Sequence, residues 1–155
     1  MGARMKILKY QKLDLEENRI ELYYNKIDQE TENIIKIIDS YNKTLTGRNE
    51  NETTWVHLSD IYYCEIIDRK CYAYLKESIW QVDISLQMLL DQFGSSGFVR
   101  ISKSMVVNIH KIERLKTDLN MRVNIILDNG ETVILNRTYR SQFYQYLEKT
   151  RREMK

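Results

Sequence analysis

The sequence predicts a mainly β fold, α+β overall, in which a largely antiparallel β domain carries short peripheral helices. Two observations support this prediction. Apolar and polar side chains alternate over short segments through the middle of the chain, as they do in half-buried strands. No proline interrupts these segments, and Asp128-Asn129-Gly130 supplies a tight turn between two of them. With 155 residues, of which 43% are hydrophobic, the chain can bury one core but is too short for two domains of ordinary size.

Residues 1–50 are predicted to form a small strand-helix unit. Alternation indicates a strand at residues 20–24, with a weaker strand beside it at residues 6–13. Asp28 is expected to cap a helix that Gly47 ends. This helix would carry an apolar stripe of Ile34, Ile35, Ile38, Tyr41 and Leu45. The stripe covers either a sheet of the same chain or a second subunit, so we expect the unit to serve dimerisation or regulation.

A polar loop at residues 48–53 marks the predicted boundary to a second domain, residues 51–155. Four strands are expected beyond this loop, at residues 54–58, 61–66, 71–75 and 79–82. The hairpin connection between the second and third of them would hold Arg69 and Lys70 at its tip. A short helix over residues 85–93 then leads into residues 94–97, which lack the Gly-Lys-Ser/Thr element of a phosphate-binding loop.

The C-terminal part of this domain contains the clearest predicted hairpin. Residues 121–127 and 132–135 alternate on either side of the Asp128-Asn129-Gly130 turn. A last helix, at about residues 139–150, would direct Phe143, Tyr146 and Leu147 inward.

Residues 98–112 combine apolar side chains suited to a core with donors suited to phosphates and base edges, namely Arg100, Ser102, Lys103 and Ser104. Positive charge is concentrated in the same part of the chain. Residues 98–155 contain 12 Lys and Arg against 6 Asp and Glu, whereas residues 1–97 contain 12 against 16. The asymmetry favours contact between the C-terminal part and a polyanion, and a solvated basic surface is the alternative.

Several classes of protein find little support in the sequence. No apolar run reaches the roughly 18 residues of a membrane span, and the N-terminus lacks a hydrophobic signal region. We therefore expect a cytoplasmic protein that is not embedded in a membrane. Cys64 and Cys71 lack zinc-site spacing, so we expect neither a metal nor a cofactor. His57 and His110 lie far apart in the sequence and no nucleophile elbow is present, so we expect no enzyme.

An ordered series of short motifs over residues 54 to 150 resembles the LytTR DNA-binding domain of bacterial transcriptional regulators. The motifs are Asp60-Ile61-Tyr62-Tyr63-Cys64-Glu65, Phe98-Val99-Arg100-Ile101-Ser102-Lys103-Ser104, Val106-Val107-Asn108, Ile112, Asp128-Asn129-Gly130 and Asn136-Arg137-Thr138-Tyr139. The resemblance implies an elongated all-β core of around ten strands, which binds promoter DNA through loops instead of a helix in the major groove.

The DNA-contacting loops of the family fall on three segments of this sequence. They are residues 68–71 with Arg69 and Lys70, then Ser102, Lys103 and Ser104, and finally Asn136, Arg137 and Thr138. Arg137 can form a bidentate contact with guanine. Lys103 suits a phosphate or a minor-groove edge, and Arg69 with Lys70 suits the next major groove or its backbone.

Two polar residues near the second loop, Arg100 and Asn108, also have possible structural roles. Arg100 either contacts a phosphate or forms a structural ion pair. Asn108 is expected to form a turn or cap rather than to contact a base. The sequence departs from the family pattern at Ser102, Met105 and Asn136, where histidine, an aromatic residue and serine are common, so the base preference of the family is not carried over.

The roughly 50 residues before the domain are too few for the receiver domain that many family members carry. The sequence therefore resembles a short, receiver-free branch, for which the resemblance implies regulation by a neighbouring membrane protein.

We predict a sequence-specific, non-enzymatic regulator that binds double-stranded promoter DNA and forms a homodimer. The alternative is a protein-interaction or RNA-binding module, but the tyrosines that could stack on RNA bases have the spacing of sheet residues. They are Tyr62, Tyr63, Tyr72 and Tyr74.

Overall fold

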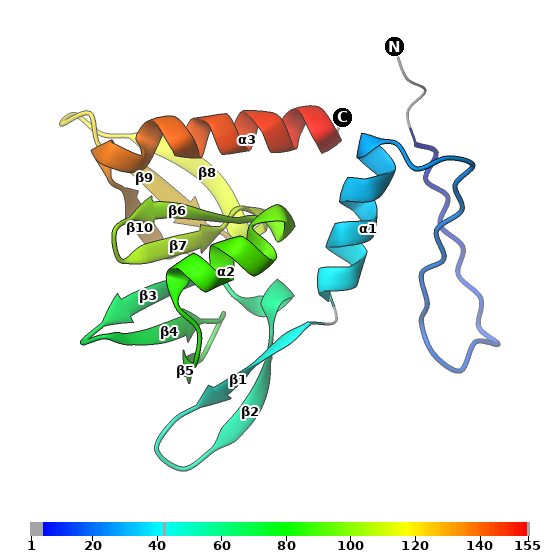
Figure 1. Cartoon of the computed structure of the whole chain (residues 1–155), viewed down its shortest axis with the longest axis horizontal. Helices are drawn as coiled ribbons and strands as arrows, with labels where there is room; N and C mark the ends of the chain where they lie inside the picture. Colours follow the sequence, from blue (N-terminus) through cyan, green and yellow to red (C-terminus); the bar gives the residue numbers. More distant parts are fainter. Residues whose placement is uncertain (1–4, 42, 155) are drawn as a thin grey trace.

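The computed structural model describes residues 5–41 and 43–154, with side chains for all of these except residues 40 and 151–154. These residues form two antiparallel sheets surrounded by three α-helices (Figure 1). The larger sheet has the strand order β2-β1-β5-β4-β3-β7-β6, and the smaller sheet has the order β10-β9-β8. The predicted mainly β, α+β fold with ten strands is therefore confirmed for the described residues.

The elements have the following bounds. The strands are β1 (Thr44–Arg48), β2 (Thr53–His57), β3 (Tyr63–Ile67), β4 (Lys70–Tyr74), β5 (Ile79–Val82), β6 (Phe98–Ser102), β7 (Met105–Asn108), β8 (Ile112–Thr117), β9 (Val123–Leu127) and β10 (Thr132–Leu135). The α-helices are α1 (Gln29–Tyr41), α2 (Leu86–Phe93) and α3 (Arg140–Met154). Short 3-10 helices are η1 (Leu58–Asp60), η2 (Gly94–Ser96), η3 (Ile109–Lys111) and η4 (Arg137–Tyr139).

Two hairpins show how turn residues determine strand pairing. In the β3–β4 hairpin Ile67 pairs with Lys70, so Asp68 and Arg69 alone form the connection. Both residues have positive φ angles, 50° and 67°, as a two-residue type I′ turn requires. In the β9–β10 hairpin, Gly130 adopts a φ of 90° and donates its N–H to the Leu127 carbonyl at 3.0 Å. Both predicted hairpins are confirmed.

Two apolar cores lie on opposite faces of β6 and β7. The first packs α2 against the larger sheet, and the second packs α3 and the smaller sheet against the other face. Phe98 belongs to the first core and Val99 to the second, because successive side chains of a strand point to opposite faces. The apolar residues of the 98–112 stretch are buried as predicted; they include Phe98, Val99, Ile101, Val106 and Val107.

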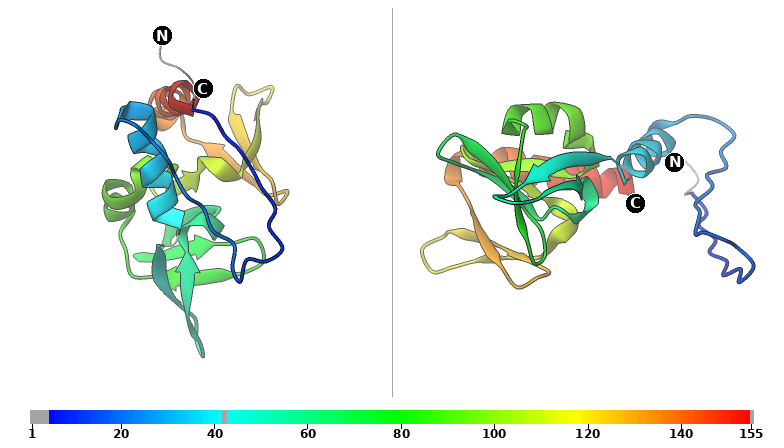
Figure 2. Two further views of the ribbon diagram at one scale, coloured as in Figure 1. Left: turned by 90° about the vertical axis from the view of Figure 1, so that its right-hand side faces the viewer. Right: turned by 90° about the horizontal axis from the view of Figure 1, so that it is seen from below.

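The predicted strands at residues 6–13 and 20–24 are wrong. Residues 5–28 contain no helix or strand, and Figures 1 and 2 show them on the far side of α1 from the sheets. Their large apolar side chains are exposed, with exposed fractions of 76% to 90% for Ile7, Leu13, Ile20 and Tyr23. Alternation alone does not make a strand, because its backbone groups need a partner, and this segment has none in the described chain.

The helix predicted to reach Gly47 ends at Tyr41, and a strand follows it. Asp28 accepts a hydrogen bond from the Thr31 N–H at 2.8 Å, so the predicted helix cap is confirmed. Leu45 lies in β1 and packs against the first core, not along the helix. A Cβ on Gly47 would approach Val56 Cγ2 to 2.5 Å, so this glycine allows close packing inside the sheet and does not end a helix.

The loop predicted as a domain boundary connects two paired strands. β1 pairs with β2 along its whole length and with β5 at Gly47 and Arg48. Part of the predicted N-terminal unit therefore belongs to the larger sheet, and the division at residue 51 stays a prediction.

β8 was not predicted, because its exposed charged residues interrupt the alternation; they are Glu113, Arg114 and Lys116.

Candidate nucleic-acid interface

The turn between β3 and β4 presents two cations at the end of the larger sheet. Arg69 occupies the second position of the type I′ turn, and Lys70 is the first residue of β4. Both side chains are exposed. The left-handed backbone at Asp68 and Arg69 restricts the turn to few conformations, so the Arg69 side chain leaves the sheet from a well-defined backbone position.

The turn between β6 and β7 is held by contacts to its own backbone. Arg100 donates from Nη1 to the Lys103 carbonyl at 2.7 Å, and Ser104 donates its N–H to Ser102 Oγ at 3.3 Å. A register shift between Arg100 and Ser102 bends β6 at the start of the turn. Lys103 and Ser104 are exposed, whereas Arg100 and Ser102 are half-buried. Arg100 thus stabilises the turn through a carbonyl contact, which differs from the ion pair considered for it.

The segment after β10 presents Arg137 on a capped helical turn. Asn136 Oδ1 accepts a hydrogen bond from the Thr138 N–H at 2.9 Å, and the Asn136 carbonyl accepts one from the Tyr139 N–H at 3.0 Å. Asn136 is therefore the N-cap of η4, which leads directly into α3. Arg137 and Thr138 are exposed at the start of this turn. The side-chain oxygen of Asn136 is already used for capping, so we expect Arg137 to be the main base-contacting residue of this segment.

Backbone hydrogen bonds connect the three predicted loops to one another. The Ile66 N–H donates to the Ser104 carbonyl at 2.8 Å and joins the end of β3 to the β6–β7 turn. The Asn136 N–H donates to the Ile101 carbonyl at 2.8 Å and joins the end of β10 to β6. All three loops lie along the left edge in Figure 1. Loops far apart in the sequence thus form one surface, with Arg69, Lys103 and Arg137 exposed along it.

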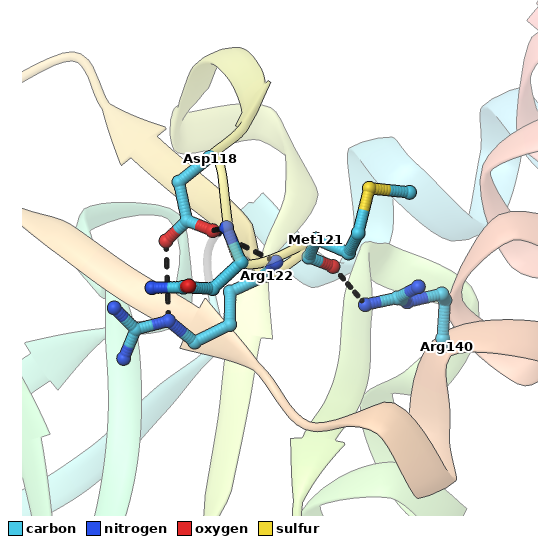
Figure 3. Close-up of polar contacts among 5 residues, drawn as sticks. Asp118, Met121, Arg122 and Arg140 are labelled. Carbon is cyan, nitrogen blue, oxygen red and sulfur yellow. Dashed lines mark hydrogen bonds and ion pairs between the residues drawn. The ribbon is translucent and has the colours of Figure 1, made fainter.

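A fourth loop, residues 118–122 between β8 and β9, joins the same edge and was not predicted as part of the site (Figures 1 and 3). Asp118 Oδ1 accepts hydrogen bonds from the N–H groups of Asn120 at 2.8 Å and Arg122 at 3.0 Å. Arg140, in the first turn of α3, donates from Nη2 to the Met121 carbonyl at 2.8 Å. The Asp118-x-Asn120 pattern is a turn signal in the sequence, but its contact with Arg140 depends on tertiary structure.

The remaining polar candidates have structural roles. Asn108 is buried, donates to the Ile61 carbonyl at 2.9 Å and accepts from the His110 N–H at 3.1 Å, so its predicted capping role is confirmed. Tyr63 and Tyr74 stack on each other with ring centroids 4.2 Å apart. Burial, followed by the hydrogen bond to Glu65, raises the pKa of Tyr74 to about 12. These two tyrosines pack within the sheet, as their spacing predicted, and do not form an open stacking platform.

The described residues contain neither a metal-binding cluster nor a membrane-spanning helix. No group of three or more His, Cys, Asp or Glu side chains is arranged to hold a metal ion in this part of the chain. Among the described helices, none has the length and apolar character needed to cross a bilayer.

Comparison with known proteins agrees with the geometry. The LytTr DNA-binding domain family matches residues 51–148, more than half of the chain. A solved LytTr DNA-binding domain from Bacillus cereus superposes with a TM-score of 0.64 at 26% identity, covering 68% of this chain and 97% of that one. An uncharacterized HTH-type transcriptional regulator from Staphylococcus aureus strain bovine RF122 / ET3-1 is 26% identical over 125 residues, which are 79% of this chain and 84% of the relative.

The term HTH in the name of that relative does not describe the fold seen here. In the described part of the chain, strands separate α1 from α2 and α2 from α3, so no two consecutive α-helices form a helix-turn-helix. The family is defined by DNA binding and is not a class of enzymes. Fold, loop geometry and family match agree, and the chain belongs to the LytTr DNA-binding domain family.

Proposed function

We propose that this protein is a sequence-specific transcriptional regulator that contacts double-stranded promoter DNA through the loops at one edge of its β scaffold. The observation that carries the proposal is the pair of backbone hydrogen bonds, Ile66 to Ser104 and Asn136 to Ile101, which align three exposed cationic loops. Loops of this kind can place arginine at base edges and lysine at phosphates along one duplex. Family membership supports the DNA partner, and the arrangement of the cations supports the specificity.

Within this proposal each loop has a defined role. Arg137 contacts guanine in a major groove, with Thr138 and Asn136 supporting its turn. Lys103, with Ser102 and Ser104, contacts a phosphate or a minor-groove edge, while Arg100 holds the turn in shape. Arg69 and Lys70 reach the neighbouring groove or its backbone. No cofactor takes part in this recognition.

Selection of bound duplexes from a random pool tests the proposal directly, because the pool contains every short operator sequence and none has to be chosen beforehand. We expect enrichment of a defined sequence that contains guanine at a position sensitive to Arg137. Circular dichroism of the same protein sample serves as the control for folding. A folded protein that enriches no sequence would contradict specific binding and favour a protein-interaction module.

We also propose a homodimer that forms through residues 5–28 and the exposed Tyr41 at the end of α1. This segment exposes apolar side chains that the described chain does not cover. Its first part carries Lys6, Lys9 and Lys12, and its next part carries Asp14, Glu16 and Glu17. Antiparallel pairing with a second copy would place these opposite charges together and supply the missing strand partner.

Sedimentation at micromolar concentration is expected to give twice the chain mass of 18.7 kDa. The substitutions Leu13→Glu and Ile20→Glu should each shift the protein to the monomer, because they place a charge on the apolar surface. Leu119→Glu is the matched control, since Leu119 is fully exposed outside this segment. A wild-type protein that is monomeric both alone and on DNA would contradict the homodimer.

We place the protein in the bacterial cytoplasm, where promoter DNA lies, and propose a membrane protein as its regulatory partner. The basis for this partner is analogy with related regulators of the LytTr DNA-binding domain family. Fractionation of cells after crosslinking should recover part of the protein with the membranes. Recovery in the cytoplasmic fraction alone would contradict the membrane partner.

A further inference from the structure

The Arg122 side chain is oriented by a carboxylate of its own loop. Its Nε donates to Asp118 Oδ2 at 3.1 Å, and its backbone N–H donates to Oδ1 of the same carboxylate at 3.0 Å (Figure 3). The Asn120 N–H donates a further hydrogen bond to Oδ1 of that carboxylate, at 2.8 Å. The backbone hydrogen bond from Arg122 is the largest of the interactions that lower the pKa of Asp118, so the carboxylate stays charged.

Among the described residues, no hydrogen bond or ion pair occupies the terminal nitrogens of Arg122. Figure 3 shows both Nη atoms at the tip of the side chain, beyond the Nε that donates to Asp118. Arg48 offers an instructive contrast, because both of its Nη atoms bind the two oxygens of Asp83, at 2.7 and 2.6 Å. The Arg48 pair uses the donors of the guanidinium for structure, whereas the Arg122 pair uses only Nε. The two Nη groups at the tip of a guanidinium can donate to the oxygens of a phosphate group.

The position of Arg122 places this donor pair next to the proposed base contact. Arg140 follows Arg137 by one helical turn at the start of α3, and its Nη2 holds the carbonyl of Met121, the residue before Arg122. The loop is thereby attached to the same helix start that presents Arg137. In Figure 1 the loop between β8 and β9 lies at the same left edge as the other three loops, next to the start of α3.

We propose that Arg122 binds a backbone phosphate of the duplex beside the base contacted by Arg137, with Asp118 and Arg140 as positioning residues. The inference rests on the proposed function and adds to it a fourth, sequence-independent contact. A phosphate is the partner because the Arg122 side chain is exposed and the Nη groups of a guanidinium fit phosphate oxygens. Asp118 orients the guanidinium in the unbound protein, so less ordering of the side chain is required when the contact forms.

The test measures DNA affinity by fluorescence anisotropy between about 50 and 200 mM salt, on the selected duplex and on a scrambled one. We expect Arg122→Gln to reduce the slope of log affinity against log salt by about 0.9, equally on both duplexes. Arg48→Gln is the matched control, because it removes an ion-paired arginine from the opposite end of the larger sheet. Thermal unfolding of each variant verifies that it is folded.

A second variant separates positioning from charge. Asp118→Asn removes a negative charge near DNA, so charge alone would raise affinity, whereas loss of the support for Arg122 should lower it. Lower affinity supports the positioning role, and higher affinity overturns it. If Arg137→Ala weakens binding but Arg122→Gln has the same affinity and salt dependence as Arg48→Gln, the phosphate contact of Arg122 is wrong and the proposed function stands. If neither Arg137→Ala nor Arg122→Gln changes binding and no duplex is enriched, the proposed function itself fails.

Discussion

Replacing Arg137 with alanine is expected to weaken binding to the specific duplex by about 1 to 3 kcal/mol, roughly 5- to 150-fold in Kd. The reason is the loss of a bidentate guanidinium contact with one base pair. The fold should not change, because η4 is capped by Asn136 and its backbone hydrogen bonds do not involve the Arg137 side chain. Anisotropy titration on specific and scrambled duplexes measures the effect.

The scrambled duplex shows which kind of contact Arg137 makes. A base contact predicts a large loss on the specific duplex and a small loss on the scrambled one. Equal losses on both duplexes would assign Arg137 to a phosphate instead. Arg48→Ala serves as the control for removing a positive charge, since Arg48 pairs with Asp83 and lies outside the four loops. Unchanged binding by Arg137→Ala would remove this residue from the interface.

The substitution Phe143→Ala is expected to lower the free energy of unfolding by about 3 to 5 kcal/mol. Phe143 is fully buried in the second core, where α3 packs against β6 and the smaller sheet. Truncation leaves a cavity at the contact that positions the start of α3, and both Arg137 and Arg140 depend on that position. Urea unfolding followed by circular dichroism measures the change.

The neighbouring Gln145 provides the control for Phe143. It lies on the exposed face of the same helix, so Gln145→Ala should change the free energy of unfolding by less than about 0.5 kcal/mol. Equal stability of Phe143→Ala and Gln145→Ala would show that α3 contributes little to the second core. Weaker DNA binding by Phe143→Ala under conditions where it remains folded would connect helix packing to the interface.

The central hairpins could be predicted from sequence because their signals are local. Asp68-Arg69 and Asp128-Asn129-Gly130 lie between alternating strands, and such turns determine register within a few residues. Asn108 could be assigned a capping role for the same reason. The motifs of the LytTR family then indicated which turns would contact DNA, and the structure places those turns on one edge.

The elements that sequence analysis missed depend on partners far away in the chain. The alternation of residues 20–24 indicates a strand, but whether one forms depends on a neighbour that the described chain does not supply. Leu45 fits a helical stripe equally well, and its place in β1 is decided by pairing with Val56. The contact between Arg140 and Met121 joins residues 19 positions apart and has no signal in the spacing of either residue.

The hydrogen bonds that align the loops have a consequence for how such regulators diversify. The Ile66 N–H to Ser104 carbonyl and Asn136 N–H to Ile101 carbonyl bonds run between main-chain atoms, which nearly every amino acid provides. Substitutions at the loop tips therefore leave the spacing between loops unchanged. On the proposed function, descendants of one ancestral gene can acquire new operators by exchanging a few tip side chains, while the distance between the grooves they contact is inherited.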